Sequence, residues 1–457
     1  MGSMKNKMAV SRLPVVFLFA ILVTSCGGGG SDSDSSSDTG FSTSGFTDWE
    51  QWSDPVDSSQ FDIAACGPGA VDASSVQAGD LDGDGRLDLL CKLVASNGGT
   101  TPYVQLAGTG SFSAWSAWRN IAVEPGCEFD LVADFNGDGL EDWLCSILWQ
   151  GRYETFYFRS DGSGFSGVGY LIGSVAASSL DLNRCRAFFV SDVNLDGRDD
   201  VICHYLYPDN SSATLRAMDD GMYSHHWDIV SSVAAPNQFR LDYCGVLDIG
   251  DVNGDGLLDQ ICLYEYASGQ SSTWVQLAAN DSFNDWQQWS ELSRPGEFDL
   301  SQCHYFHSVD IDGDGLIDNL CMYQDGPDTG ILVQTDSPVT TGFQYGHWES
   351  WFALSTDIIG CRDFDAAVPD VIEMSGDGMS DIICAYRNST TSMTTWIQRS
   401  TGSNYGSWEA WTPALNFELD RCSALVAADV NGDHHTDLVC PYRFDDGSTA
   451  TFVQRQI

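Results

Sequence analysis

A nine-residue acidic pattern recurs seven times along the chain, and it constrains the fold more than any other feature. The pattern is D-x-[D/N]-G-D-G-x-x-D, and its copies begin 54 to 63 residues apart. A repeat of this period between strand-like segments is typical of propellers and solenoids. The copies are DLDGDGRLD from Asp80, DFNGDGLED from Asp134, DVNLDGRDD from Asp192, DVNGDGLLD from Asp251, DIDGDGLID from Asp310, EMSGDGMSD from Glu373 and DVNGDHHTD from Asp429.

An aromatic motif, F/Y-x-x-W-x-x-W, recurs with the same period but out of phase with the acidic loops. The first copy begins at Phe46, and the chain ends on TATFVQRQI, where the next copy would be due. In a ring, residues 46–53 would supply the outer strand of the last blade and remove an open sheet edge. A linear solenoid would need capping repeats instead. We therefore expect an all-β, seven-bladed propeller closed by the N-terminal strand. The other copies, two of them degenerate, begin at Phe112, Phe165, Tyr223, Phe283, Tyr345 and Tyr405.

Each unit is expected to contain four strands. The first is apolar and runs into the acidic loop, as in residues 129–133, and the second leaves the loop, as in residues 143–148. The third resembles TWVQLA at Thr273, and the fourth is the aromatic motif. No segment sustains a 3.6-residue apolar period, so little helix is expected.

The carboxylates of each acidic loop would repel one another unless the loop wraps around a cation. They stand at positions 1, 3, 5 and 9, position 7 can add its backbone carbonyl, and glycine at position 6 permits a positive φ. Oxygen ligands of this number suit Ca²⁺ better than Mg²⁺. We therefore predict up to seven bound Ca²⁺ ions. The predicted ligands are Asp80, Asp82, Asp84, Arg86 and Asp88; Asp134, Asn136, Asp138, Leu140 and Asp142; Asp192, Asn194, Asp196, Arg198 and Asp200; Asp251, Asn253, Asp255, Leu257 and Asp259; Asp310, Asp312, Asp314, Leu316 and Asp318; Glu373, Ser375, Asp377, Met379 and Asp381; Asp429, Asn431, Asp433, His435 and Asp437.

Two loops depart enough from the pattern to predict weak or empty sites. In the sixth, Glu373 and Ser375 replace the first two ligands. In the seventh, His434 replaces the glycine of position 6, where a side chain is strained. Leu195 replaces a glycine at position 4 of the third loop, which we take as a milder change.

The loops differ from an EF-hand, which needs glutamate at position 12 and flanking helices. Here position 12 is a cysteine and the flanks are strand-like. The short acidic loop between strands resembles the FG-GAP or VCBS repeat family, over residues 46–457. This resemblance implies a propeller like that of integrin α subunits, with Ca²⁺ sites on one face. It also implies that the calcium ties the first two strands of each blade together and takes no part in catalysis.

Fourteen of the fifteen cysteines occur two per unit, which predicts seven disulfides and an oxidising compartment. A simple hairpin ladder would leave the two members of a pair about four residues, or roughly 13 Å, out of register. Disulfides need Cα atoms within about 7 Å, so pairing within a blade requires the chain to fold back. The alternative joins neighbouring blades and would link Cys440 to Cys66. We favour pairing within blades: Cys66/Cys91, Cys127/Cys145, Cys185/Cys203, Cys244/Cys262, Cys303/Cys321, Cys361/Cys384 and Cys422/Cys440.

The N-terminal segment predicts export with a lipid anchor. A positive stretch and the short apolar run of residues 13–23 form a signal peptide over residues 1–25. The run ends on VTSC, which resembles a bacterial lipobox and predicts lipidation of Cys26. Residues 26–45 form a Gly/Ser/Asp tether, followed by the propeller at 46–457. By resemblance to Gram-negative lipoproteins, Gly27 favours an outer-membrane or cell-surface location.

The net charge and the absence of catalytic motifs narrow the range of possible functions. A net charge of −45 excludes binding to nucleic acid by phosphate neutralisation and leaves the lipid anchor as the contact with the membrane. No nucleophile elbow, zinc-protease or phosphate-loop motif occurs, so we expect no enzyme. The tryptophans of the aromatic motif are expected to pack between blades, although fungal lectins of this propeller type bind sugars there.

We therefore predict a monomeric, non-catalytic adhesion or recognition module for a glycan or a protein ligand. The alternatives are a carbohydrate-active enzyme, such as a polysaccharide lyase, or its targeting module, and a purely structural surface protein. The sequence identifies neither the ligand nor the face that would bind it.

Overall fold

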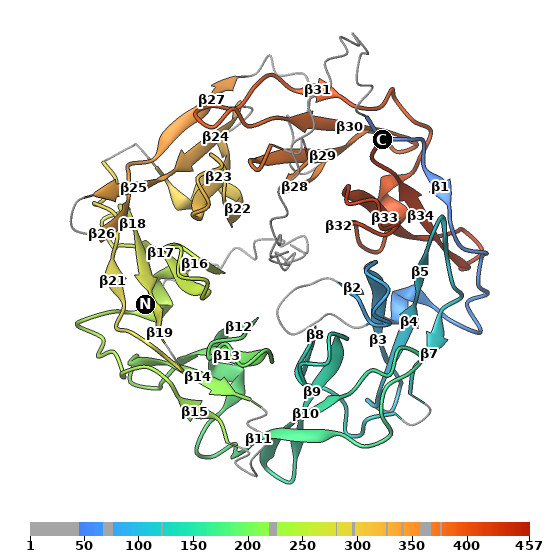
Figure 1. Cartoon of the computed structure of the whole chain (residues 1–457), viewed down its shortest axis with the longest axis horizontal. Helices are drawn as coiled ribbons and strands as arrows, with labels where there is room; N and C mark the ends of the chain where they lie inside the picture. Colours follow the sequence, from blue (N-terminus) through green and yellow to red (C-terminus); the bar gives the residue numbers. More distant parts are fainter. Residues whose placement is uncertain are drawn as a thin grey trace, which may run out of the picture.

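Seven four-stranded antiparallel sheets form the blades of a closed ring (Figure 1). The computed structural model describes residues 45–66, 76–119, 122–218, 226–279, 281–294, 298–325, 328–339, 342–355, 367–374 and 377–457. Within these ranges the chain forms strands and short 3-10 turns, without an α-helix. The predicted seven-bladed propeller is confirmed. The predicted signal peptide, Cys26 and the predicted tether up to residue 44 lie outside the described residues, and no helix in the described part could span a membrane.

The blades are numbered here by the order of their innermost strands, and Figure 1 places those strands nearest the centre of the ring. From the inside outward, blades 1 to 4 are β2 (Val76–Gly79), β3 (Asp88–Val94), β4 (Thr100–Gln105) and β7 (Ser116–Ala117); β8 (Phe129–Ala133), β9 (Asp142–Trp149), β10 (Arg152–Phe158) and β11 (Tyr170–Ala176); β12 (Cys185–Ser191), β13 (Asp200–Leu206), β14 (Ser212–Ala217) and β15 (Asp228–Ile229); β16 (Cys244–Gly250), β17 (Asp259–Glu265), β18 (Ser271–Gln276) and β21 (Gln287–Gln288). Blades 5 to 7 are β22 (Cys303–Val309), β23 (Asp318–Asp325), β24 (Asp328–Gln334) and β27 (Glu349–Ser355); β28 (Ala367–Glu373), β29 (Ser380–Ser389), β30 (Ser392–Gln398) and β31 (Glu409–Ala410); β32 (Val426–Ala428), β33 (Asp437–Arg443), β34 (Thr449–Gln454) and β1 (Glu50–Gln51).

The ring closes by pairing the two ends of the propeller sequence. Strand β1 lies antiparallel to β34, with Glu50 opposite Val453 and Gln51 opposite Phe452. In Figure 1 the blue strand β1 lies beside the red strands of blade 7. The predicted closure by the N-terminal strand is therefore confirmed, and blade 7 has no open edge left by the chain terminus.

The aromatic motif joins neighbouring blades at five of the seven junctions. The ring of Trp52, on the outer strand of blade 7, lies 6.1 Å from that of Phe112 in blade 1, and the Phe112 amide donates to the Trp52 carbonyl at 2.8 Å. Both side chains are buried, as expected for packing between blades. The same ring and backbone contacts join Trp118 to Phe165, Trp289 to Tyr345, Trp351 to Tyr405 and Trp411 to Phe46.

Blade 2 departs from the expected position of the fourth strand. Its motif FSGVGYL begins at Phe165 and lacks tryptophan, and the outer strand β11 begins only at Tyr170 and continues to Ala176. The outer strand here forms a long ladder with β10. Most of the fourth strand of blade 2 thus lies beyond the aromatic motif, so the predicted position of this strand is wrong.

Buried threonine and glutamine side chains connect the third strands of several neighbouring blades. Thr451 in β34 and Gln105 in β4 are both fully buried, and the Thr451 hydroxyl donates to Gln105 Oε1 at 2.5 Å across the closing junction. The bond is absent between blades 5 and 6, because Ile331 of blade 5 takes the place of the threonine. Among the described residues, Gln398 Oε1 of blade 6 therefore has no hydrogen-bond partner. Equivalent bonds join Thr214 to Gln276, Thr273 to Gln334 and Thr395 to Gln454.

We predict that Thr451→Val lowers the free energy of unfolding by about 1–3 kcal/mol, because it leaves the buried Gln105 oxygen without a partner. Urea denaturation followed by tryptophan fluorescence measures the change. The control is Thr391→Val at an exposed turn, where a shift within about 0.5 kcal/mol is expected. An equal loss in both variants would contradict a special role for the closing bond.

Candidate functional site

The acidic loops all lie on one face of the propeller. Each connects the innermost strand of a blade to the second, as the segment 80–87 connects β2 to β3. Because neighbouring strands are antiparallel, these connections emerge from all blades at the same face of the propeller. The turns between second and third strands, and the segments that carry the first cysteines, leave on the opposite face, which we call the disulfide face.

The carboxylate of position 1 organises the six loops that have aspartate there. In the first loop, Asp80 accepts the amides of Gly83 at 2.7 Å, Asp84 at 3.2 Å and Gly85 at 3.0 Å. These bonds fold the loop backbone around the carboxylate. The loop amides are therefore hydrogen-bonded without regular secondary structure. The same arrangement surrounds Asp134, Asp192, Asp251, Asp310 and Asp429.

The residue at position 6 adopts a left-handed backbone, as predicted. Gly85 has a φ of 83°, and His434 of the seventh loop has a φ of 64°. The His434 amide still donates to Asp429 at 2.9 Å, so this loop keeps the shared backbone path at the cost of a strained histidine. Leu195, at position 4 of the third loop, is also left-handed, with a φ of 56°.

The carboxylate of position 9 connects the loop to the rest of its blade. In blade 1, Asp88 accepts the Leu81 amide of the loop at 3.0 Å and the Ala107 amide, two residues beyond β4, at 2.7 Å. Asp88 is fully buried, and this burial raises its pKa to about 7, although the two amide bonds oppose the shift. Burial likewise raises the pKa of Asp142, Asp200 and Asp437 to about 7 and that of Asp259 to about 8.

Carboxylate oxygens converge in the loops that have aspartate at position 3. One oxygen each from Asp80, Asp82 and Asp88 lies within 4.8 Å of the others. Asp310, Asp312 and Asp314 form an equivalent group in the fifth loop. Hard oxygen donors at these separations can hold a divalent cation.

The remaining predicted ligands occupy equivalent loop positions with differences in detail. Asparagine stands at position 3 of four loops, and in the second loop Asn136 Nδ2 donates to Asp142 at 2.8 Å. Arg86, at position 7 of the first loop, forms an ion pair with Asp84. In the sixth loop, Ser375 lies outside the described residues, and the side chain of Glu373 is not described. Ligation through the position 7 carbonyls remains a prediction.

Neighbouring loops are connected through their backbones, which sequence reasoning did not find. The amide of position 8 donates to the carbonyl of position 1 in the preceding blade, as from Glu141 to Asp80 at 3.1 Å and from Asp199 to Asp134 at 2.9 Å. The bond from Leu87 to Asp429, at 3.1 Å, crosses the closing junction. The loops therefore form a connected belt at these junctions.

Six disulfides lie within blades. Their Cα atoms are 5.2 to 5.6 Å apart, and they join Cys66 to Cys91, Cys127 to Cys145, Cys185 to Cys203, Cys244 to Cys262, Cys303 to Cys321 and Cys422 to Cys440. A register shift supplies the expected adjustment in blade 3, where it brings Cys185 opposite Tyr205, two residues beyond Cys203. The predicted pairing within blades is confirmed for these six.

The seventh predicted disulfide, between Cys361 and Cys384, is not among the pairs that the structure describes. Cys384 is fully buried in β29, where it lies opposite Pro369 in β28 and Trp396 in β30, and its sulfur is disulfide-bonded. Cys361 lies outside the described residues. Participation of Cys384 in a disulfide is therefore confirmed, whereas its pairing with Cys361 stays a prediction.

The sequence analysis missed a motif next to the first cysteine, F-x-[I/L]-x-x-C. In blade 4 it reads FRLDYC, and its last four residues form a 3-10 turn that ends at Cys244. Phe239 stacks on Trp286 of the same blade with ring centroids 4.4 Å apart. The recurrence of FDIAAC, FDLSQC and FELDRC was the available signal. The equivalent stacks join Phe61 to Trp115, Phe298 to Trp348 and Phe417 to Trp49.

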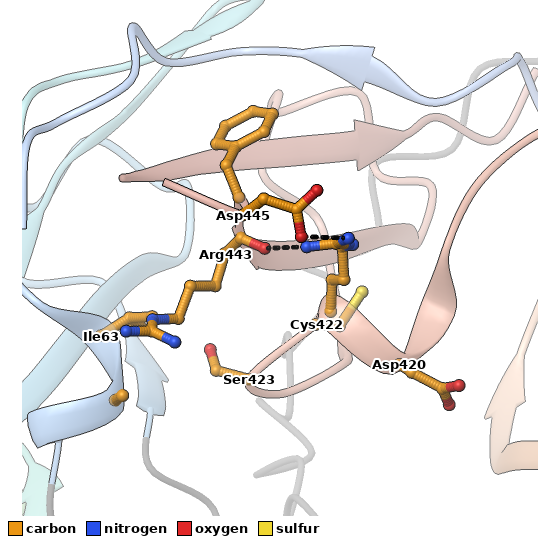
Figure 2. Close-up of a pocket in the computed structure, with 9 residues that line it drawn as sticks. Ile63, Asp420, Cys422, Ser423, Arg443 and Asp445 are labelled. Atoms are coloured by element: carbon orange, nitrogen blue, oxygen red, sulfur yellow. Dashed lines mark hydrogen bonds and ion pairs between the residues drawn. The ribbon is translucent and has the colours of Figure 1, made fainter. Parts of the chain in front are cut away.

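A hollow of about 410 Å³ lies on the disulfide face between blades 7 and 1 (Figure 2). The Arg421 guanidinium donates to Asp445 at 2.6 Å, and Arg443 lies 3.4 Å from Asp62. Figure 2 shows Ser423 and Cys422 beside these charged groups. Each arginine is already paired with a carboxylate, so the arrangement is that of a polar junction between blades.

A repeat-family match and one solved structure agree with this fold. Residues 374–440 match the FG-GAP-like repeat family. An Agrocybe aegerita lectin, described for specific recognition of non-reducing terminal N-acetylglucosamine, has 17% identity and a TM-score of 0.52, covering 74% of this chain and 79% of the lectin. AofleA from Arthrobotrys oligospora has 10% identity and a TM-score of 0.36, covering 81% and 90%. An exo-β-1,3-galactanase from Phanerochaete chrysosporium has 9% identity and a TM-score of 0.33, covering 83% and 95%. No curated protein matches the chain significantly.

We predict that His434→Gly raises the free energy of unfolding by about 0.5 kcal/mol or more. The strain of a left-handed histidine, about 1–2 kcal/mol, exceeds the added backbone entropy of glycine. His435→Gly is the control, because its φ is not positive and glycine there should bring no gain. Thermal unfolding of both variants measures the difference, and equal shifts would contradict the strain.

The raised pKa values predict how stability depends on pH in protein stripped of divalent metal. Asp88, Asp142, Asp259 and Asp437 hold protons in the folded state to a higher pH than in the unfolded chain. Their contribution to stability is therefore present below about pH 4 and lost as pH rises through about 7 to 8. Urea midpoints should fall between pH 5 and pH 8.5, and a rise over that range would contradict the shifts.

Proposed function

We propose that this protein is a calcium-stabilised, exported propeller that acts as a non-catalytic recognition module for glycans. The observation that carries the proposal is the belt of acidic loops on one face, with carboxylates gathered around the loop interiors. A rigid ring of blades with FG-GAP-like repeats and a lectin-like structural neighbour fits a recognition module.

The donor chemistry of the loops supports Ca²⁺ as the ion. Asp80, Asp82 and Asp88 offer oxygen donors from three positions of one loop, and Asp84 stands in the same loop. Carboxylate and carbonyl donors in a flexible loop suit Ca²⁺. The ion would neutralise carboxylates that the fold crowds together and hold the first two strands of each blade in register. The resemblance to FG-GAP repeats implies that this role is structural.

Export rests on the disulfides. Six of them in the described residues indicate an extracellular or exported protein. We further propose that the lipobox-like VTSC sequence directs lipidation of Cys26 and that residues 26–45 tether the propeller to the outer membrane or cell surface.

The choice of a glycan over a protein ligand rests on the lectin-like neighbour and on the aromatic content of the blades. Trp149 is 51% exposed at the tip of the β9–β10 hairpin on the disulfide face, where an indole ring can stack on a sugar. A protein ligand is the second candidate, favoured by the breadth of both faces. A carbohydrate-active enzyme remains the alternative in the catalytic class.

We predict that calcium raises the melting temperature and that a chelator reverses the rise. A single site held at 100 times its Kd adds about 2.7 kcal/mol to the free energy of unfolding. Differential scanning calorimetry in 1 mM CaCl₂, in 1 mM MgCl₂ and in EDTA measures the effect, and magnesium is the control. Equal melting temperatures in calcium and EDTA would contradict the calcium proposal.

The recognition proposal predicts saturable binding on a glycan array for the calcium-loaded protein. Trp149→Ala should then reduce the signal at least tenfold, whereas Tyr170→Ala on the outer strand β11 should not. A blank array from protein that is folded in calcium would refute the glycan form of the proposal. Turnover of a polysaccharide would instead place the protein among the enzymes.

A further inference from the structure

Blade 3 has an arginine at a buried register position that blade 2 fills with Tyr157 and the other five blades fill with aliphatic side chains. Arg216 in β14 lies opposite Ile202 in β13. The equivalent residue of blade 4, Val275, lies opposite Ile261, and Val275 is fully buried. The position is held by Val104, Val333, Ile397 and Val453 in blades 1, 5, 6 and 7, and all four are fully buried.

The charge of Arg216 is directed at the third acidic loop. Arg216 is 5% exposed, and its Nη1 lies 3.8 Å from Asp200 Oδ2 and 2.5 Å from Asp281 Oδ1. Asp200 is the position 9 carboxylate of that loop and is itself 2% exposed. A buried guanidinium is costly unless carboxylates compensate it, so Arg216 is stabilised both by Asp281, the nearer carboxylate, and by Asp200.

The oxygen that Arg216 approaches is the one that faces the loop interior. Asp200 Oδ2 accepts the loop amide of Val193 at 3.3 Å. In the second and seventh loops, the matching Oδ2 atoms of Asp142 and Asp437 accept the position 3 asparagine side chain. Arg216 therefore places a positive charge beside the oxygen that a bound cation would use.

We propose that Arg216 is the resident cation of the third loop and takes the place of a metal ion there. The third loop then binds Ca²⁺ far more weakly than the fourth, although its ligand residues follow the pattern. This inference rests on the proposed calcium binding of the other loops. It differs from the sequence-based expectation, in which the sixth and seventh loops alone were weak.

The arginine of the first loop does not have the same effect. Arg86 is partly exposed and pairs with Asp84 at position 5, which is also partly exposed. Its side chain can turn toward solvent when a cation binds, because no packed core holds it. Arg216 has no such freedom, since the apolar side chains of Phe189, Ile202 and Val230 are buried in the same part of the ring.

The test compares the position 9 carboxylates of two adjacent loops in the full chain. Bound calcium is counted by mass spectrometry of the metal after gel filtration in CaCl₂. Asp259→Asn in the fourth loop should lose one Ca²⁺ per chain, and Asp200→Asn should lose none. A loss of one ion from both variants would overturn the role of Arg216 and leave calcium binding intact.

A second variant decides the matter if Asp200→Asn does not fold. Arg216→Val restores the side chain found in blade 4, so it should bind one more Ca²⁺ per chain than the wild type. Its metal-free melting temperature should fall, because Asp200 loses its cation, while its rise on adding calcium should exceed the wild-type rise. An unchanged calcium count would overturn the inference. Absence of calcium from the wild type and all variants would refute the proposed calcium binding itself.

Discussion

The position 9 carboxylate of each acidic loop is the group on which the construction of a blade depends. In blade 1, Asp88 joins three segments, because it begins β3, accepts an amide from the preceding loop and accepts another from the segment after β4. The same second bond recurs in blades 2, 4, 6 and 7 through Ser160, Ala278, Ser400 and Gln456. Since the carboxylate is buried, its charge requires compensation, and the loop around it provides a place for a cation.

Three types of contact between blades recur at several junctions of the ring. Aromatic pairs connect the outer strands, Thr–Gln bonds connect the third strands, and amide bonds connect the acidic loops. All three types also occur at the junction between blades 7 and 1, although the two sides of that junction come from opposite ends of the propeller sequence. The closing junction therefore uses contacts that also occur at other junctions, and the ring does not depend on a special closing element.

The repeat made most of the fold predictable. The acidic pattern indicated the number of blades, and the phase of the aromatic motif indicated the closure between β1 and β34. The pairing of cysteines within blades needed the structure, because the register shift beside Cys185 cannot be read from spacing. The role of Arg216 could not be predicted from the sequence for a similar reason. It departs from the repeat by only one altered residue, and its meaning appears once the strand register places it opposite Ile202 and beside Asp200.

The residues of the site were predictable from the sequence, and the differences between the loops were predictable only in part. The sequence indicated the strained histidine of the seventh loop, but not the ion pair that joins the third loop to a buried arginine. Charge compensation from neighbouring strands is a tertiary effect, so a motif alone cannot rank the loops. The belt is therefore a set of unequal sites.

A crystal structure grown in calcium, with an anomalous difference map collected at long wavelength, tests the role of the acidic belt most directly. We predict peaks within the first and fifth loops, near Asp80 and Asp310, and none within the third loop beside Arg216. A map without peaks in any loop would contradict the role assigned to the belt.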